Sequence, residues 1–165
     1  MKNGETMLIA YDGSEEAARA MAMAARLLKP GIVEIITAWE PTIRQAARAV
    51  SRTGLHQSTV APDVSVDPEV DPAYEEAMAI CTGGIDVAES LGLAGRAHLV
   101  EVTTTIAAAL IDAAHELDVD VIVTGSRGLT GFRAWWNSST AESIVRDAGL
   151  PVFIVPPEAD RGATD

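Results

Sequence analysis

The hydrophobic residues of the chain gather in short runs that alternate with longer stretches of mixed polarity. Runs that are rich in Val and Ile and apolar almost throughout are typical of parallel strands buried on both faces. Most of these runs are bounded by Gly, Pro or Asp, which favour turns. The five predicted strands are Met7–Tyr11, Ile32–Trp39, Ala97–Val102, Val119–Thr124 and Pro151–Val155.

The segments between these strands carry signals for helices. Ser14 stands directly before two glutamates, so its hydroxyl is predicted to cap a helix. Asp71 and Pro72 form a second start signal, and the threonines at 103–105 can cap a third helix. Gly83 and Gly84 are expected to weaken the second helix in its middle. The predicted helices are Ser14–Leu28, Ala73–Leu93, Ile106–Leu117 and Ser139–Ala148.

Between Thr42 and Val70 the periodic pattern fades into a stretch rich in Ser, Thr, Pro and Asp. A loop of this length is uncommon inside a compact domain. We therefore expect residues 42–70 to be a flexible insertion, with a short helix over Ile43–Val50. Because no repeat or domain boundary divides the chain, residues 1–157 are predicted to form a single domain and residues 158–165 a disordered tail.

The order of these elements predicts the fold class. Strands that alternate with helices favour an α/β fold, here an open, doubly wound, five-stranded parallel sheet flanked by helices, Rossmann-like in its layout. In such sheets ligands bind beyond the carboxyl ends of the strands, where the strand order reverses. Asp12 and Gly13 follow the first strand and Gly125 follows the fourth, so we expect them at that edge.

Composition narrows the candidate functions. The chain has 165 residues and a formal net charge of −12, with 24 acidic residues against 12 basic. This acidity argues against nucleic acid and against anionic membranes, whereas a local group of N–H dipoles can still bind one small anion. Cys81 is the single cysteine, which excludes an intrachain disulfide, and no Cys/His spacing resembles a zinc site. The polar N-terminal segment and the lack of a long apolar run lead us to expect a cytoplasmic protein.

The stretch "VIVTGSRGLTGFRAWWNSSTAESIV" places Gly125, Gly128 and Gly131 between a predicted strand and a predicted helix. Such glycines let the main chain approach a ligand, and hydroxyls at the helix start can join its N–H groups around a phosphate. Arg127 and Arg133 would add positive charge. The stretch is neither a Walker A motif nor a dinucleotide fingerprint. By spacing alone, a surface loop that ends in a Ser/Thr helix cap is the favoured interpretation.

Two long stretches of the chain resemble the universal stress protein family. "MLIAYDGSEEAARAMAMAARLL" is similar to the opening strand, Asp-Gly-Ser turn and first helix of that family, and "VDVIVTGSRGLTGFRAWWNSSTAESIVRDAGLPVFIVP" to its C-terminal signature. Nucleotide-binding members carry Gly-x2-Gly-x9-Gly-Ser/Thr. Gly125 and Gly128 match the first two glycines and Ser139 the final Ser/Thr, whereas Ser138 replaces the third glycine.

The resemblance implies the adenine nucleotide alpha hydrolase-like form of the α/β fold and a homodimer, often made through the last strand, here Pro151–Val155. It also implies an adenine nucleotide as ligand: ATP, with or without Mg²⁺, or AMP or cAMP. The nucleotide would lie in the cleft at the carboxyl edge of the first and fourth strands. The binding residues carried over from the family are Ala10, Tyr11, Asp12, Ala38, Thr124, Gly125, Arg127, Gly128, Ser138, Ser139 and Thr140.

Two functions follow from this pattern. The first is a regulatory stress-response module that binds nucleotide and catalyses at most slow ATP hydrolysis or autophosphorylation, since the sequence offers no positioned general base. The second is a dimeric interaction protein of the same fold that binds no nucleotide, which the replacement at Ser138 and the bulk of Tyr11 favour. Trp135 and Trp136 would then belong to its contact surface. A third, weaker alternative is an enzyme that acts on a small anionic substrate in the same cleft.

Overall fold

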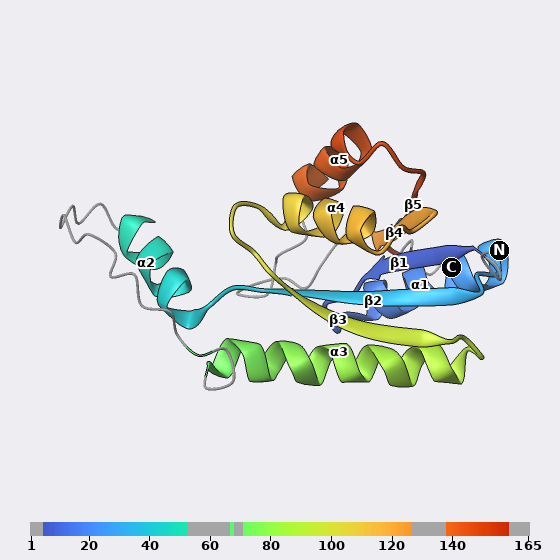
Figure 1. Cartoon of the computed structure of the whole chain (residues 1–165), viewed down its shortest axis with the longest axis horizontal. Helices are drawn as coiled ribbons and strands as arrows, with labels where there is room; N and C mark the ends of the chain where they lie inside the picture. The colour runs from blue at the N-terminus through green and yellow to red at the C-terminus, as the bar shows by residue number, and fades with distance from the viewer. Residues whose placement is uncertain (1–4, 53–66, 68–70, 127–137, 159–165) are drawn as a thin grey trace, which may run out of the picture.

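The computed structural model describes residues 5–52, 67, 71–126 and 138–158. Within this part of the chain the strands form one parallel sheet with the order β3-β2-β1-β4-β5 (Figure 1). The strands are β1 Thr6–Ala10, β2 Ile32–Trp39, β3 Gly95–Glu101, β4 Val121–Gly125 and β5 Val152–Val155. The chain adds strands outward on one side of β1 and then on the other, so the order reverses there. The predicted five-stranded, doubly wound α/β fold is confirmed.

Helices cover both faces of the sheet. α1 (Glu15–Leu28) and α3 (Pro72–Ser90) pack on one face, and α4 (Ile106–Glu116) and α5 (Ser138–Asp147) on the other (Figure 1). α2 (Thr42–Arg52) lies outside these layers, beyond the carboxyl end of β2. This arrangement leaves the carboxyl edge of the sheet bordered by helix starts, which is where such folds place ligands.

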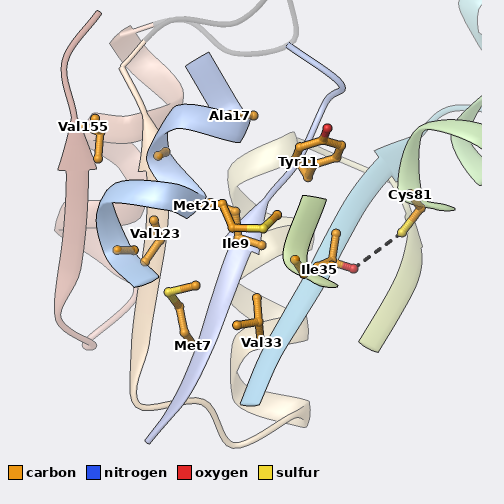
Figure 2. Packing of buried hydrophobic residues seen from close by; sticks show 13 residues of the cluster. Met7, Ile9, Tyr11, Ala17, Met21, Val33, Ile35, Cys81, Val123 and Val155 are labelled. Atoms are coloured by element: carbon orange, nitrogen blue, oxygen red, sulfur yellow. Dashed lines mark hydrogen bonds between the residues drawn. The ribbon is translucent and has the colours of Figure 1, made fainter. Parts of the chain in front are cut away.

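The core on the α1 and α3 side consists mainly of aliphatic side chains and methionines. Met7 and Ile9 of β1 and Val33 of β2 are fully buried, and Met21 of α1 packs over them (Figure 2). Cys81 of α3 joins the same cluster and is buried. Burial of each large apolar side chain contributes roughly 1.5–3 kcal/mol, so this layer holds α1 and α3 firmly on the sheet.

The opposite face has its own core. Leu8 alternates with Met7 and Ile9 along β1 and therefore points to the other side, where it meets Ile36 and Ile122. Leu110 of α4 and Ile144 of α5 close this layer. β1 is thus buried on both faces, which explains why its sequence is continuously apolar.

Side chains cap three of the helices. The Ser14 hydroxyl accepts the Ala17 N–H at 3.1 Å and starts α1, as predicted. Asp71 likewise starts α3, and Thr105 starts α4 by accepting the Ala108 N–H at 3.1 Å. Each cap satisfies an N–H group that has no partner within its own helix.

Two helices agree with the predictions. α3 runs through Gly83 and Gly84, as the predicted helix Ala73–Leu93 does. The short helix predicted over Ile43–Val50 of the insertion is present as α2, which runs from Thr42 to Arg52. The rest of that insertion, apart from residue 67, and the tail after residue 158 lie outside the described residues.

Among the helices that the structure describes, none combines the length and the apolar character that crossing a membrane requires.

Candidate functional site

A cavity of about 270 Å³ opens at the carboxyl edge of the sheet, above the end of β1 and between β2 and β4. This is the point at which the strand order reverses, and neighbouring connections there leave in opposite directions. The strand ends form its floor, and helices form its walls. The described residues that line it are Ala10, Tyr11, Asp12, Ser14, Ala17, Ile36, Thr37, Ala38, Gln45, Ala73, Glu76, Ala77, Ile80, Ile106, Leu110, Thr124 and Gly125.

The turn after β1 fixes a carboxylate at the rim of this cleft. Gly13 has a φ of 80°, a left-handed conformation that glycine adopts without strain. Asp12 accepts the Ser14 N–H at 2.9 Å and also the Ser14 hydroxyl, both on Oδ1. Because one oxygen of Asp12 holds the turn, the carboxylate has a set position from which its other oxygen can meet a ligand.

Main-chain hydrogen bonds fix the position of Tyr11, and its ring is buried. Its N–H donates to the Ile36 carbonyl at 2.9 Å, and its own carbonyl accepts the Thr37 hydroxyl at 2.9 Å. Burial, together with the negative charge of Asp12, raises the pKa of the Tyr11 phenol above its ordinary value. The hydroxyl therefore stays protonated at neutral pH and can act as a hydrogen-bond donor.

Ala38 lies on β2 beyond the last residue that pairs with β1. β1 pairs with β2 up to Ala10 opposite Ile36, and the Tyr11 N–H still reaches the Ile36 carbonyl. Alternate residues of a strand direct their peptide groups to the same side. The N–H and C=O of Ala38 are therefore expected to face the β1 side, where the cleft replaces the neighbouring strand.

The end of β4 closes the cleft on the other side. The buried Thr124 hydroxyl donates to the Gly125 carbonyl at 2.7 Å, and the Ser126 N–H donates to the Val155 carbonyl at 3.0 Å. The bond from Ser126 holds the exit of β4 against β5, so the chain leaves the sheet at Ser126 from a fixed point.

The walls of the cleft are apolar. Ala73, Ala77 and Ile80 recur on one face of α3, and Ile106 and Leu110 come from the first turns of α4. Sequence reasoning missed these wall residues. The i, i+4, i+7 spacing of the three α3 positions was a visible signal, but it indicates only a buried helix face and not what that face covers.

The charges around the cleft are mostly negative. Asp12 and Glu76 are the acidic side chains of its described lining, which contains no Lys, Arg or His. The described residues also contain no group of three or more His, Cys, Asp or Glu side chains that could hold a metal ion. A phosphate would therefore depend on main-chain N–H groups, on a helix start or on Arg127, which lies outside the described residues.

The structure brings together part of the predicted site. Six of the predicted residues line this same cleft: Ala10, Tyr11, Asp12, Ala38, Thr124 and Gly125. Thr140 is half-buried in the first turn of α5, and only the helical backbone is described for Ser138 and Ser139. Arg127 and Gly128, like Trp135 and Trp136, lie outside the described residues, so their roles stay predictions.

A doubly wound parallel sheet with an apolar-walled cleft at its reversal point places the chain in the doubly wound class of α/β proteins. Residues 4–156 match the universal stress protein family, and the chain therefore belongs to that family. The family resemblance of the two sequence stretches is confirmed.

The relatives agree over nearly the whole chain. The universal stress protein in the QAH/OAS sulfhydrylase 3′ region of Thermus aquaticus is 29% identical over 159 residues, which cover 92% of this chain and 98% of that protein. A universal stress protein solved in complex with cAMP is 24% identical with a TM-score of 0.59, covering 92% and 97% of the two chains. The universal stress protein from Archaeoglobus fulgidus solved in complex with dAMP is 20% identical with a TM-score of 0.59, covering 93% and 98%.

Proposed function

We propose that the cleft binds an adenine nucleotide and that binding regulates the protein rather than starting rapid turnover. The observation that carries this proposal is the cavity of about 270 Å³ at the reversal point, which joins apolar walls to polar groups at the ends of β1, β2 and β4. Small-molecule sites combine these two features: apolar walls supply affinity, and a few placed polar groups supply orientation.

The adenine base would enter between the apolar faces of α3 and α4. Ala73 and Ala77 leave room there that larger side chains would fill. The peptide N–H and C=O of Ala38 would pair with the edge of the base, which offers acceptor and donor atoms side by side. Tyr11 and Asp12 would orient the base and the ribose from the end of β1.

The phosphates would lie toward the exit of β4. Gly125 lines the cleft there, and α5 begins at Ser138, so N–H groups at its start carry partial positive charge. Gly128, Ser139 and Thr140 would hold the phosphate oxygens, with Arg127 as a source of charge. Ser138 would supply a hydroxyl where the family motif has glycine.

The solved relatives support this assignment. Two universal stress proteins with similar folds were solved in complex with cAMP and with dAMP. ATP, AMP and cAMP are accordingly the ligands to compare. Mg²⁺ would accompany ATP through its phosphates, since the described cleft residues provide no cluster of metal ligands. Any turnover would be limited to slow ATP hydrolysis or autophosphorylation.

A calorimetric titration tests the proposal with ATP, AMP and cAMP, each with and without Mg²⁺. A nucleotide present at a hundred times its Kd stabilises the fold by about 2.7 kcal/mol, which thermal unfolding detects. The variant Ala73→Leu narrows the cleft and should weaken binding at least about tenfold. Ala47→Leu, on an exposed position of α2 away from the cleft lining, is the matched control. Absence of stabilisation at millimolar nucleotide, or equal affinity in both variants, contradicts the proposal.

A second property is favoured by β5, which is the last strand on its side of the sheet among the described residues. β5 pairs with β4 and ends the strand order, so its outer main-chain groups face away from the sheet. Ile154 on this strand is 40% exposed, and Val145 on the adjacent α5 is 55% exposed. An edge with apolar side chains is a template for pairing with a second copy. We propose a homodimer through β5, which would serve either the nucleotide-dependent function or an interaction protein without nucleotide.

A further inference from the structure

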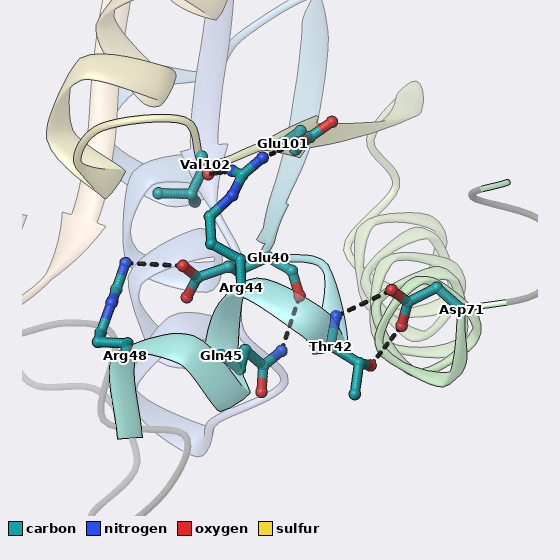
Figure 3. A network of polar contacts seen from close by, with 8 residues as sticks. All are labelled: Glu40, Thr42, Arg44, Gln45, Arg48, Asp71, Glu101 and Val102. Carbon is teal, nitrogen blue, oxygen red and sulfur yellow. Dashed lines mark hydrogen bonds and ion pairs between the residues drawn. The ribbon is translucent and has the colours of Figure 1, made fainter. Parts of the chain in front are cut away.

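One carboxylate caps two helices at the mouth of the cleft. Asp71 accepts the Ala73 N–H of α3 at 2.9 Å on Oδ1. The same side chain accepts the Thr42 N–H of α2 at 2.8 Å on Oδ2 and the Thr42 hydroxyl on Oδ1 (Figure 3). The starts of α2 and α3 therefore converge on Asp71, which is 2% exposed.

α2 depends on polar contacts of this kind. None of its residues with a described side chain is buried. Besides the bonds of Thr42 to Asp71, Gln45 donates to the Glu40 carbonyl at 2.7 Å, and Arg48 pairs with the Glu40 carboxylate at 2.7 Å. Arg44 donates to the Val102 carbonyl and pairs with Glu101 at 2.8 Å (Figure 3). A helix without a buried apolar face opens more easily than α1 or α4 when such bonds are lost.

Both capped helices contribute to the wall of the cleft. Gln45 reaches the cleft from the second turn of α2, and Ala73, Glu76 and Ala77 reach it from the first two turns of α3. We propose that Asp71 is a positioning residue, which holds α2 against the start of α3 and thereby sets the mouth of the nucleotide cleft. The expected effect of Asp71 on nucleotide binding rests on the proposed function. Its expected effect on α2 rests on the hydrogen bonds alone.

The charge state of Asp71 agrees with this role. Burial by itself would raise the pKa of the carboxyl group, but the hydrogen bonds from the Thr42 hydroxyl, the Thr42 N–H and the Ala73 N–H outweigh burial and lower it. The side chain is thus ionised at neutral pH, and hydrogen bonds to an ionised acceptor are the stronger kind.

Asp71→Asn separates the two caps. The amide oxygen can occupy the side that faces the Thr42 hydroxyl and the Ala73 N–H, so α3 stays capped. The amide NH₂ then faces the Thr42 N–H, and two donors cannot bond. Hydrogen exchange should therefore accelerate about tenfold along α2 and remain near the wild-type rate in the first turn of α3. AMP or ATP binding should weaken by about the same factor.

Two further variants keep the test specific. Thr42→Val removes the hydroxyl donor and leaves the Thr42 N–H bond, so it should change α2 exchange in the same direction by a smaller factor. Asp120→Asn is the matched control, because Asp120 accepts the Thr6 N–H at 2.7 Å at the opposite edge of the sheet. It should lower the free energy of unfolding by about as much as Asp71→Asn does, and it should leave both α2 exchange and nucleotide affinity unchanged.

The outcomes are distinct. Faster α2 exchange with weaker nucleotide binding in Asp71→Asn, and neither effect in Asp120→Asn, supports the role of Asp71. Unchanged α2 exchange in Asp71→Asn overturns it. Faster α2 exchange in Asp71→Asn together with the same nucleotide affinity as in Asp120→Asn overturns it as well. If the wild-type protein binds no adenine nucleotide, the proposed function fails, and the exchange rates alone then decide whether Asp71 holds α2.

Discussion

Two adjacent glycines in α3 show how tertiary contacts act at a single residue. A Cβ atom at Gly84 would lie 2.9 Å from Ile35 Cγ2 and 2.9 Å from Tyr11 Cδ1. A Cβ at Gly83 would meet no atom within 4 Å. Gly84 therefore lets α3 approach β2 and the Tyr11 ring, whereas Gly83 only lowers the helix propensity of α3.

Alanine substitutions at these glycines should have opposite effects on stability. Gly84→Ala overpacks a site bordered by a β-branched side chain and a fixed ring. We therefore expect the free energy of unfolding to fall by roughly 1–2 kcal/mol, even after the gain in helix propensity. Gly83→Ala should raise the free energy of unfolding by up to about 1 kcal/mol. Urea unfolding of both variants measures the difference. Stabilisation by both substitutions would show that α3 does not pack as closely as the contacts at Gly84 indicate.

At the scale of elements, α2 and α3 behave as a pair because they share a capping carboxylate. The lowered pKa of Asp71 makes that pairing depend on pH. The group contributes its full stability at pH values above the unfolded pKa, about 3.9. That contribution is lost as the pH falls through the lower pKa of the folded state.

Comparison of the wild-type protein with Asp71→Asn isolates this contribution. The difference in their free energies of unfolding should be constant above about pH 5 and should shrink as the pH falls below about 4. Denaturant unfolding at intervals between pH 3 and pH 7 measures it, and the other titrating groups cancel in the difference. A difference that grows on acidification would mean that the Asp71 carboxyl is not stabilised in its charged form.

At the scale of the whole molecule, the proposed dimer must form between two copies that each carry a formal net charge of −12. Repulsion between them extends over about 8 Å at physiological ionic strength and further at low salt. Apolar contact at β5 would have to outweigh this repulsion. The dimer should therefore be stronger at physiological than at low ionic strength.

Ile154→Glu tests the dimer, since a charge placed on the β5 edge should raise the dissociation constant at least about tenfold. Ile43→Glu is the matched control, because Ile43 on α2 is 41% exposed against 40% for Ile154. Sedimentation velocity at low and physiological salt measures both variants. A monomeric wild-type protein, or equal weakening by both substitutions, would remove the β5 edge from the assembly.

The predicted residues that lie at strand ends line one cleft in the structure. Asp12 and Gly125 follow predicted strands, and parallel strands bring their carboxyl ends to one edge. The walls of α3 and α4 were not recovered, because Ala73, Ala77 and Leu110 are ordinary core residues in sequence. Only the packing of the helices over the strand ends turns those positions toward the cleft.

The sequence by itself determined the order of strands and helices, because hydrophobic periodicity and caps such as Ser14 act between near neighbours in the chain. The tertiary structure alone decided the close approach of α3 to β2 at Gly84, the shape of the cleft and the joint capping by Asp71. Thr42 and Asp71 stand 29 positions apart, and Tyr11 is further still from Gly84. Such contacts depend on how elements meet in space, which no local pattern records.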